Sequence, residues 1–329
     1  MTDHPLPVVD LGAAGRVGYL VPAGPRLSEG AIEGVVDGLR AAMAASVAPV
    51  AEVTGLSAPP DQGMRVVSRA GWVRQNCAMA GDMLELAART PLRRPSGPRE
   101  QVEARVNGAQ LGGALAFMAT RVLGQYLPFG RDPMLLLVAP NVASVERELG
   151  VDHADFRLWV CLHEQTHRLQ FHQAPWLRDY LIRQMGALLE QPQRRIPARE
   201  GLLRGSVLDA LTTPEQRVVF ERISGVMALL EGYADVMMDR VGPDVVPTVG
   251  HIRRLFEKRR SRGGVHALLN RLLGMDLKLA QYRDGAAFCQ AVIAAVGVDG
   301  LNVVYSGAGL LPSMEEIHDP QRWLRRVHP

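Results

Sequence analysis

The stretch "VCLHEQTHRLQFHQ", residues 160–173, is the part of the chain from which the fold can be inferred most directly. Apolar residues recur through it at helical spacing, which predicts a helix over residues 152–173. Residues four apart on a helix lie about 40° apart around its axis. His163 and His167 should therefore point the same way, close enough for both imidazoles to reach one metal ion. Glu164, about 100° further round, should lie beside that ion.

This His-Glu-x-x-His pattern is typical of zinc hydrolases, in which the histidines bind the metal and the glutamate is the general base. The alternative is an ordinary amphipathic helix whose histidines are satisfied by nearby acids. An apolar stripe on the same helix favours the metal site, because it places the histidines within or beside a core. The stripe consists of Leu158, Trp159, Leu162 and Leu169. We therefore predict His163 and His167 as zinc ligands and Glu164 as the base.

A catalytic zinc needs a third protein ligand and one open position. His172 lies nine residues after His163, about 180° round the helix, so it is excluded as that ligand. In metzincins the motif continues to a glycine and a third histidine, but the corresponding residues here are Gln170 and Gln173. The third ligand must therefore come from another segment.

The segment "ALLEGYADVMMD", residues 228–239, offers Glu231 directly after two leucines, where an unpaired carboxylate would be costly. Asp235 is one turn later on the same face. This Glu-x-x-x-Asp pattern resembles that of gluzincins such as thermolysin, in which the Glu binds zinc and the Asp hydrogen-bonds the outer nitrogen of the first histidine. The resemblance implies Glu231 as the third ligand and Asp235 as the partner of His163. The alternative is an exposed acidic stripe on a surface helix.

Four longer stretches extend the resemblance beyond these motifs. They are "DFRLWVCLHEQTHRLQF" (155–171), "LLEGYADVMMD" (229–239), "LLGMDLKLAQYRDGAAFC" (272–289) and "LPSMEEIHDPQRWLRRV" (311–327). Together they resemble the actinobacterial zinc-dependent metalloprotease family once named domain of unknown function 2342. Some of its members carry the label of a hydrolase associated with deazaflavin cofactor biosynthesis. The resemblance covers the chain from about residue 100, and more loosely the N-terminus, and it implies a zincin-like fold with zinc as the cofactor.

The remaining sequence predicts an α+β protein that is predominantly α-helical, with a small sheet. One strand is expected within residues 132–141, and the first 25 residues are expected to form loop with room for one short strand. Helical periodicity predicts further helices over residues 28–45, 69–90, 101–125 and 213–241. The small residues of the helix at 101–125 suggest close packing against another helix.

Capping residues support three of these helices. Ser28 is expected to cap the first, and either Asp152 or Asp155 the helix that carries the histidines. Thr213 is followed by a proline and by Gln216, which together predict a capping box.

A proline-rich segment at 91–100 is the best linker candidate. We expect residues 1–100 to form a mainly helical portion packed on a catalytic region, residues 101–329, with both in one compact unit.

Composition narrows the functional class. A net charge of +3 argues against a dedicated polyanion binder, and the basic run at 251–264 is interpreted as a solvated face. The three cysteines are far apart, which predicts free buried thiols in a reducing compartment. The N-terminus lacks a signal-peptide pattern, and the longest apolar run, residues 134–140, is too short to cross a bilayer. We expect a soluble cytoplasmic protein that binds neither nucleic acid nor membrane.

The function expected from these features is zinc-dependent hydrolysis of a peptide or small amide. Zinc lowers the pKa of water that it binds toward ~7, and Glu164 would take a proton from that water and pass it to the leaving amine. The alternatives are a zinc hydrolase of a small metabolite and a non-catalytic, metal-stabilised scaffold, although a scaffold needs no general base. Possible donors to the oxyanion are Tyr233, Tyr282 and Tyr305, and no spacing argument selects among them.

Overall fold

The computed structural model describes most of the chain, and the statements below concern these residues. They are 9–60, 63–87, 95–189, 213–261 and 279–329. They form two compact units. The N-terminal unit comprises Pro5–Gln173 and Met237–Phe256, and the C-terminal unit comprises Ala174–Val236 and Glu257–Pro329. The predicted boundary near residue 100 stays a prediction. The predicted fold class, predominantly helical α+β with a small sheet, is confirmed.

The N-terminal unit is built around a sheet of three short strands, which are β1 (Met64–Val67), β2 (Gly124–Leu127) and β3 (Met134–Val138). The order is β1-β3-β2, with β1 parallel and β2 antiparallel to β3. β3, the strand predicted from the sequence, is central and is buried from its second residue onward. Such a continuous apolar run is typical of a strand covered on both faces.

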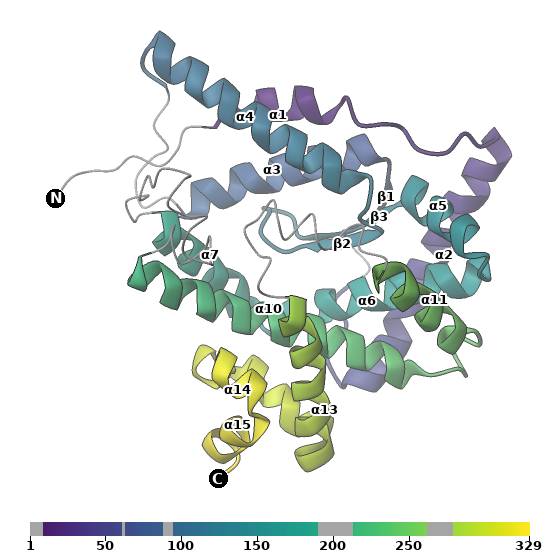
Figure 1. Cartoon of the computed structure of the whole chain (residues 1–329). Helices are drawn as coiled ribbons and strands as arrows, with labels where there is room; N and C mark the ends of the chain where they lie inside the picture. The colour runs from purple at the N-terminus through teal and green to yellow at the C-terminus, as the bar shows by residue number, and fades with distance from the viewer. Residues whose placement is uncertain (1–8, 61–62, 88–94, 190–212, 262–278) are drawn as a thin grey trace. The chain divides into compact units, whose positions relative to one another are not determined.

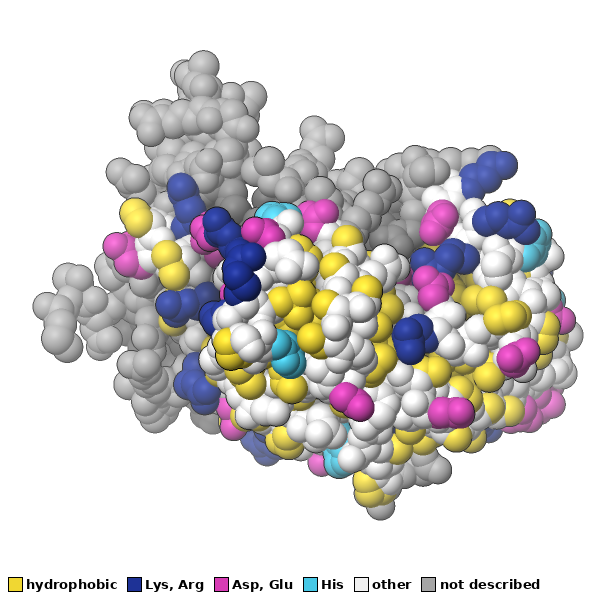
Figure 2. Space-filling view, turned by 90° about the horizontal axis from the view of Figure 1, so that it is seen from below, with side chains coloured by type: hydrophobic (Ala, Val, Ile, Leu, Met, Phe, Trp, Pro, Cys, Tyr) yellow, Lys and Arg dark blue, Asp and Glu magenta, His cyan; other side chains and the backbone are white. Residues whose placement is uncertain are grey.

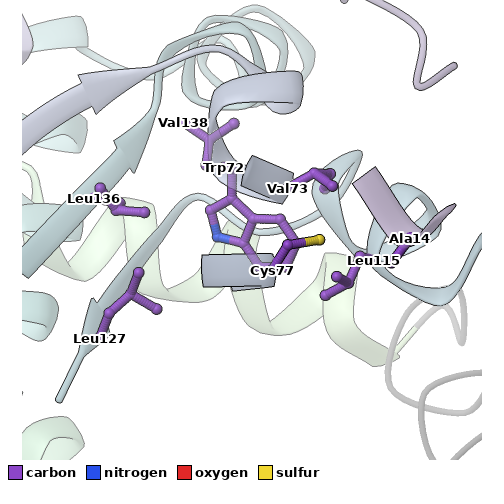
Figure 3. Packing of buried hydrophobic residues seen from close by; sticks show 9 residues of the cluster. Ala14, Trp72, Val73, Cys77, Leu115, Leu127, Leu136 and Val138 are labelled. Atoms are coloured by element: carbon purple, nitrogen blue, oxygen red, sulfur yellow. The ribbon is translucent and has the colours of Figure 1, made fainter. Parts of the chain in front are cut away.

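One face of this sheet is covered by α3 (Arg69–Ala87) and α4 (Pro98–Ala119), with α1 (Leu11–Gly18) packed beside them (Figure 1). The indole of Trp72 lies at the centre of the resulting core (Figure 3). The other core residues are Ala14, Val73, Cys77, Leu115, Ala119, Leu127, Leu136 and Val138. Replacing a buried tryptophan by alanine removes about 3–5 kcal/mol of stability, so this face contributes strongly to folding.

Residues 11–18 were expected to form loop, and this expectation is wrong, because they form α1. Three glycines lower the intrinsic helix propensity of this segment, so tertiary contacts and a cap must compensate. The Asp10 carboxylate accepts a hydrogen bond from the Ala13 N–H at 2.8 Å. Two glycines let α4 approach α1 closely. A Cβ on Gly108 would lie 2.1 Å from the carbonyl oxygen of Asp10, the N-cap of α1, and a Cβ on Gly112 would lie 2.3 Å from the carbonyl oxygen of Ala14. The predicted close packing of the 101–125 helix is thus found against α1.

The opposite face of the sheet packs against α6 (His153–Gln173) (Figure 1). Side chains alternate along a strand, so Leu135 and Leu137 of β3 point away from the Trp72 core. α2 (Glu29–Thr54) packs along α6. α5 (Ala139–Leu149) connects β3 to α6 in the chain. Ser28 is the N-cap of α2, as predicted, but the helix continues nine residues past the expected end at residue 45.

The regular secondary structure in the described part of the C-terminal unit is helical. Its α-helices are α7 (Pro175–Leu189), α10 (Pro214–Val241) up to Val236, α11 (Val249–Ser261) from Glu257 onward, α13 (Leu279–Asn302), α14 (Met314–His318) and α15 (Pro320–Val327). Two 3-10 helices, η1 (Val303–Ser306) and η2 (Ala308–Leu310), follow α13. α10 and α13 come into close contact where each carries a glycine. A Cβ on Gly232 of α10 would lie 2.1 Å from the carbonyl carbon of Gly285 of α13.

The predicted capping box at the start of α10 is confirmed. The Thr213 N–H donates to Gln216 Oε1 at 2.9 Å, and the Gln216 N–H donates to Thr213 Oγ1 at 3.2 Å. α10 then continues without interruption from residues of the C-terminal unit into Met237–Val241 of the N-terminal unit.

Two helical segments, Glu29–Thr54 and Asp284–Ser306, are long and apolar enough to cross a membrane by length and composition alone. The core helix of a water-soluble protein meets the same criteria, and α2 packs along α6. Length and composition are therefore weak grounds for assigning either helix to a membrane.

The three cysteines are free and buried, as predicted. Burial raises the pKa of the Cys289 thiol far above its ordinary value, and burial also raises the pKa of Cys77. Because the thiolate is the reactive form, we expect a thiol reagent such as Ellman's reagent to label the native protein very slowly. In denaturant all three thiols should react at once. Rapid labelling of the native protein would contradict this packing.

Candidate metal centre

α6 is buried almost all round its circumference in the stretch that carries the motif. From Trp159 to Gln170 every residue is buried except His163 and His167, which are half-buried. Five polar side chains are buried in this stretch, namely Glu164, Gln165, Thr166, Arg168 and Gln170. Buried polar groups are costly unless they find partners, so this concentration marks a site rather than an ordinary core helix.

The N-terminal end of α6 is fixed by charged and hydrogen-bonded contacts. Arg157 makes two hydrogen bonds, of 2.7 and 3.0 Å, to the carboxylate of Glu146, which is 1% exposed. Asp155 accepts two bonds from Thr248, at 2.7 Å from its N–H and 2.6 Å from its hydroxyl. Asp152, one of the two predicted caps, accepts from the Asp155 N–H at 2.9 Å. Removing one partner of a buried ion pair lowers folding stability by about 3–5 kcal/mol, so the Glu146–Arg157 pair anchors this end of α6 firmly.

The two histidines direct their Nε2 atoms toward each other. These atoms lie 3.2 Å apart, and the rings are nearly perpendicular, at 88°. Two imidazole nitrogens that bind one tetrahedral zinc at about 2.0–2.1 Å are separated by about 3.3 Å. The spacing of the His163 and His167 nitrogens therefore fits a shared metal ion.

The outer nitrogens of both rings have partners that favour the tautomer a metal requires. His167 Nδ1 lies 2.9 Å from Oε1 of Gln170, an amide oxygen that can only accept, so Nδ1 carries the proton. His163 Nδ1 lies 3.3 Å from the thioether sulfur of Met238, which is also a weak acceptor. Both Nε2 atoms are thereby left with a lone pair for a metal.

Met238 lies on α10, the helix that carries the predicted third ligand. Glu231 precedes it by seven residues, or two turns, and therefore lies on the same face of α10. Ligand atoms of His163, His167 and Glu231 all lie within 4.8 Å of one another, so the three could hold one metal ion. Two histidines and a glutamate are a donor set of catalytic zinc sites, and the residues fit this metal.

Asp235 lies one turn after Glu231 and is likewise half-buried. Its predicted hydrogen bond to His163 stays a prediction. The next acid on this side of α10, Asp239, is exposed and pairs with Arg253 of α11 (Val249–Ser261) at 2.7 Å.

Glu164, the predicted base, is 8% exposed and points toward the sheet. Its Oε2 accepts a hydrogen bond of 3.1 Å from the N–H of Tyr126 in β2. A backbone donor of an ordered strand thus fixes one carboxylate oxygen. The contact joins the motif helix to a strand that the sequence did not predict.

The remaining candidates lie elsewhere. His172 is exposed and does not belong to the group of converging ligand atoms, which agrees with its exclusion. The Tyr233 hydroxyl donates to Asn302 Oδ1 at 2.8 Å, and its ring packs edge-on against Tyr305 in the core of the C-terminal unit. The side chain of Tyr282 lies outside the described residues.

Sequence reasoning missed Gln170, Met238 and Tyr126. Gln170 could have been found, because it lies one turn after His167 on the same helix and can reach the outer nitrogen of that ring. Met238 and Tyr126 could not, since each depends on how another element packs against α6.

The chain is similar to a family of known proteins and to a solved structure. A profile of zincin-like metallopeptidases matches residues 9–324. A crystal structure from Chloroflexus aurantiacus, of a protein provisionally assigned as a hydrolase with a novel fold, is 32% identical and has a TM-score of 0.69. The similarity covers 97% of this chain and 99% of that one. No curated protein matches the chain. The predicted actinobacterial subgroup and the association with deazaflavin biosynthesis stay predictions.

Gln170 provides a test of the tautomer argument. Gln170→Leu removes the acceptor for His167 Nδ1, and loss of such a partner typically weakens metal binding by about 10–100-fold. The zinc dissociation constant, measured by competition with a chelator, should rise accordingly. Gln165→Leu, at another buried glutamine of α6, should leave the dissociation constant near that of the wild type. Equal constants for both variants would contradict the role given to Gln170.

Proposed function

The chain belongs to the zincin-like metallopeptidase family, and from this premise we propose that it is a zinc-dependent hydrolase that cleaves an amide or peptide bond. The observation that carries the proposal is that the ligand atoms of His163 and His167, on the buried His-Glu-x-x-His helix, lie within 4.8 Å of one another and of a ligand atom of Glu231 on α10. Structural zinc sites are usually closed by four protein ligands, whereas three ligands leave one position open for chemistry. Within the described part of the chain three such ligand atoms converge, which supports a catalytic metal rather than a structural one.

His163, His167 and Glu231 are the residues that would hold the zinc. When bound, zinc acts as a Lewis acid that acidifies water and polarises a carbonyl group. The role of the protein is to keep both imidazoles in one tautomer and one orientation, which Gln170 and Met238 support through the outer nitrogens. We propose that Asp235 shares the Nδ1–H of His163 with the weakly accepting sulfur of Met238, as the gluzincin pattern implies.

Glu164 is the general base of the proposed reaction. It follows His163 directly in the sequence, and its side chain is buried. The Tyr126 N–H holds Oε2, so the other oxygen, Oε1, is assigned the proton transfer. It takes a proton from the attacking water and delivers it to the leaving amine, which becomes a better leaving group when protonated.

The proposed substrate is a peptide or a small amide in the cytoplasm, and nucleic acid is not expected to bind. Within α11, the basic helix, Phe256 packs edge-on against Trp159 with ring centroids 5.0 Å apart, so its ring is engaged in packing and not presented for base stacking. On the face in Figure 2, acidic and basic side chains of the described residues lie interspersed among apolar and uncharged atoms. These features support a protein surface without a strong field of one sign, and a substrate that is recognised by contacts at the site itself.

Metal analysis of two variants tests the proposal. Wild-type protein should bind about one zinc per chain, and His163→Ala should bind much less because it removes one of three ligands. His172→Ala replaces an exposed histidine of the same helix and should keep the metal. Unchanged zinc content in His163→Ala would rule out this site.

Turnover is measured separately with a library of peptides and small amides. Glu164→Gln should retain zinc and lower kcat by about 100-fold or more, because the amide cannot accept the proton. Cleavage of small amides alone would identify a metabolite hydrolase. Zinc binding without hydrolysis of any library member would favour the scaffold alternative.

A further inference from the structure

Gly124, the first residue of β2, lies directly against the side chain of Glu164. A Cβ on Gly124 would lie 2.6 Å from Glu164 Cγ and 3.1 Å from its Cδ. It would also lie 3.0 Å from Cδ2 of Leu137 in β3. Real Cβ atoms do not approach other heavy atoms to 2.6 Å, so even the smallest side chain would force Glu164 or the strand to move.

Glycine is required at position 124 because a larger side chain would clash, and not because the backbone adopts a conformation that only glycine tolerates. Gly124 is absent from the glycines with positive φ, which include Gly55 and Gly63. Alanine can therefore adopt the backbone of Gly124, and glycine inside a strand is normally the weaker choice. A glycine that lowers strand stability while leaving room for Glu164 indicates a function connected with that side chain.

Two residues further along β2, the backbone holds the end of the same side chain. The Tyr126 N–H donates to Glu164 Oε2 at 3.1 Å. The backbone N–H and C=O groups of successive residues in a strand point to opposite sides. The carbonyl of Leu123 accepts from the Val138 N–H of β3 at 2.8 Å, so the backbone groups of odd-numbered residues are directed toward β3. The N–H of an even-numbered residue such as Tyr126 is therefore directed away from β3.

β2 itself is fixed from several directions, so it can serve as a rigid support. It pairs with β3 over all four of its residues. Asn76 of α3 donates to Gln125 Oε1 at 3.1 Å. The segment before β2 is held by Asn141, which donates to the carbonyls of Ala119 and Val122 at 2.8 and 2.7 Å.

We propose that Gly124 is a positioning residue for Glu164. Its missing side chain leaves the space through which the Glu164 methylene groups pass, so that the carboxylate reaches the Tyr126 N–H. The inference rests on the proposed function only in giving Glu164 the role of base. Since reacting groups must be placed closely, a displacement of about 1 Å lowers turnover by about 100-fold.

The test compares Gly124→Ala with Gly113→Ala, each made in the wild type and in Glu164→Ala. Gly113 lies in α4, and a Cβ there meets no atom within 4 Å. In the wild-type background, Gly124→Ala should lower the melting temperature by on the order of 5 °C, as expected for overpacking. In the Glu164→Ala background most of this loss should vanish, with a remainder due to Leu137. Equal losses in both backgrounds would overturn the proposal.

Kinetic and metal measurements separate positioning from general damage. Gly124→Ala should retain wild-type zinc content, lower kcat by about 100-fold and leave KM nearly unchanged, because neither the metal ligands nor substrate contacts are altered. Gly113→Ala should keep the wild-type kcat. A wild-type kcat in Gly124→Ala would refute the positioning role. Should the wild type hydrolyse no substrate, the proposed function fails, while the stability comparison still decides whether Gly124 positions Glu164.

Discussion

The burial of α6 is the constraint on which the site depends. A helix surrounded by protein carries polar side chains at a cost unless they find partners, because an unpaired polar group away from water costs several kcal/mol. Partners for α6 come from its own next turn, as with Gln170, and from other elements, as with Met238 of α10 and the Tyr126 N–H of β2. The same contacts that satisfy these groups also fix their orientations.

The surrounding fold supplies these partners in fixed positions. β3 is covered on both faces, and its pairing with β2 fixes the register that brings the Tyr126 N–H to Glu164. The Glu146–Arg157 pair and the Asp155–Thr248 contacts fix the beginning of α6. Rigid support of this kind is required for a catalytic group, because orientation and proximity supply a large part of the rate enhancement.

Much of this arrangement could be predicted from the sequence. The motif helix, a strand at the position of β3 and the Thr213–Gln216 capping box follow from local spacing and capping chemistry. Glu231 as a partner of the two histidines was implied only by the resemblance to gluzincins, and its ligand atom lies near theirs. The failures have physical causes. β1 and β2 have only four residues each and show no clear alternation, so their pairing with β3 defines them. α1 contains three glycines and is stabilised by a cap and by its packing on α4.

The site therefore combines two kinds of information. The pairing of the two histidine ligands is local, since helical spacing alone brings His163 and His167 together. The orientation of Glu164 is not local, because Gly124 and Tyr126 lie about 40 residues earlier in the chain and their role appears only once the sheet packs on α6. This division explains why a short motif can identify the chemistry of a protein and still leave its support unrecognised.

The central claim is that one zinc ion is bound by His163, His167 and Glu231. It is tested most directly by anomalous X-ray diffraction from crystals of the zinc-loaded protein, recorded on both sides of the zinc absorption edge. The account predicts one strong peak within about 2.0–2.2 Å of both histidine Nε2 atoms and a Glu231 carboxylate oxygen. A peak bound by other residues, or none between these three in crystals shown to contain zinc, would contradict it.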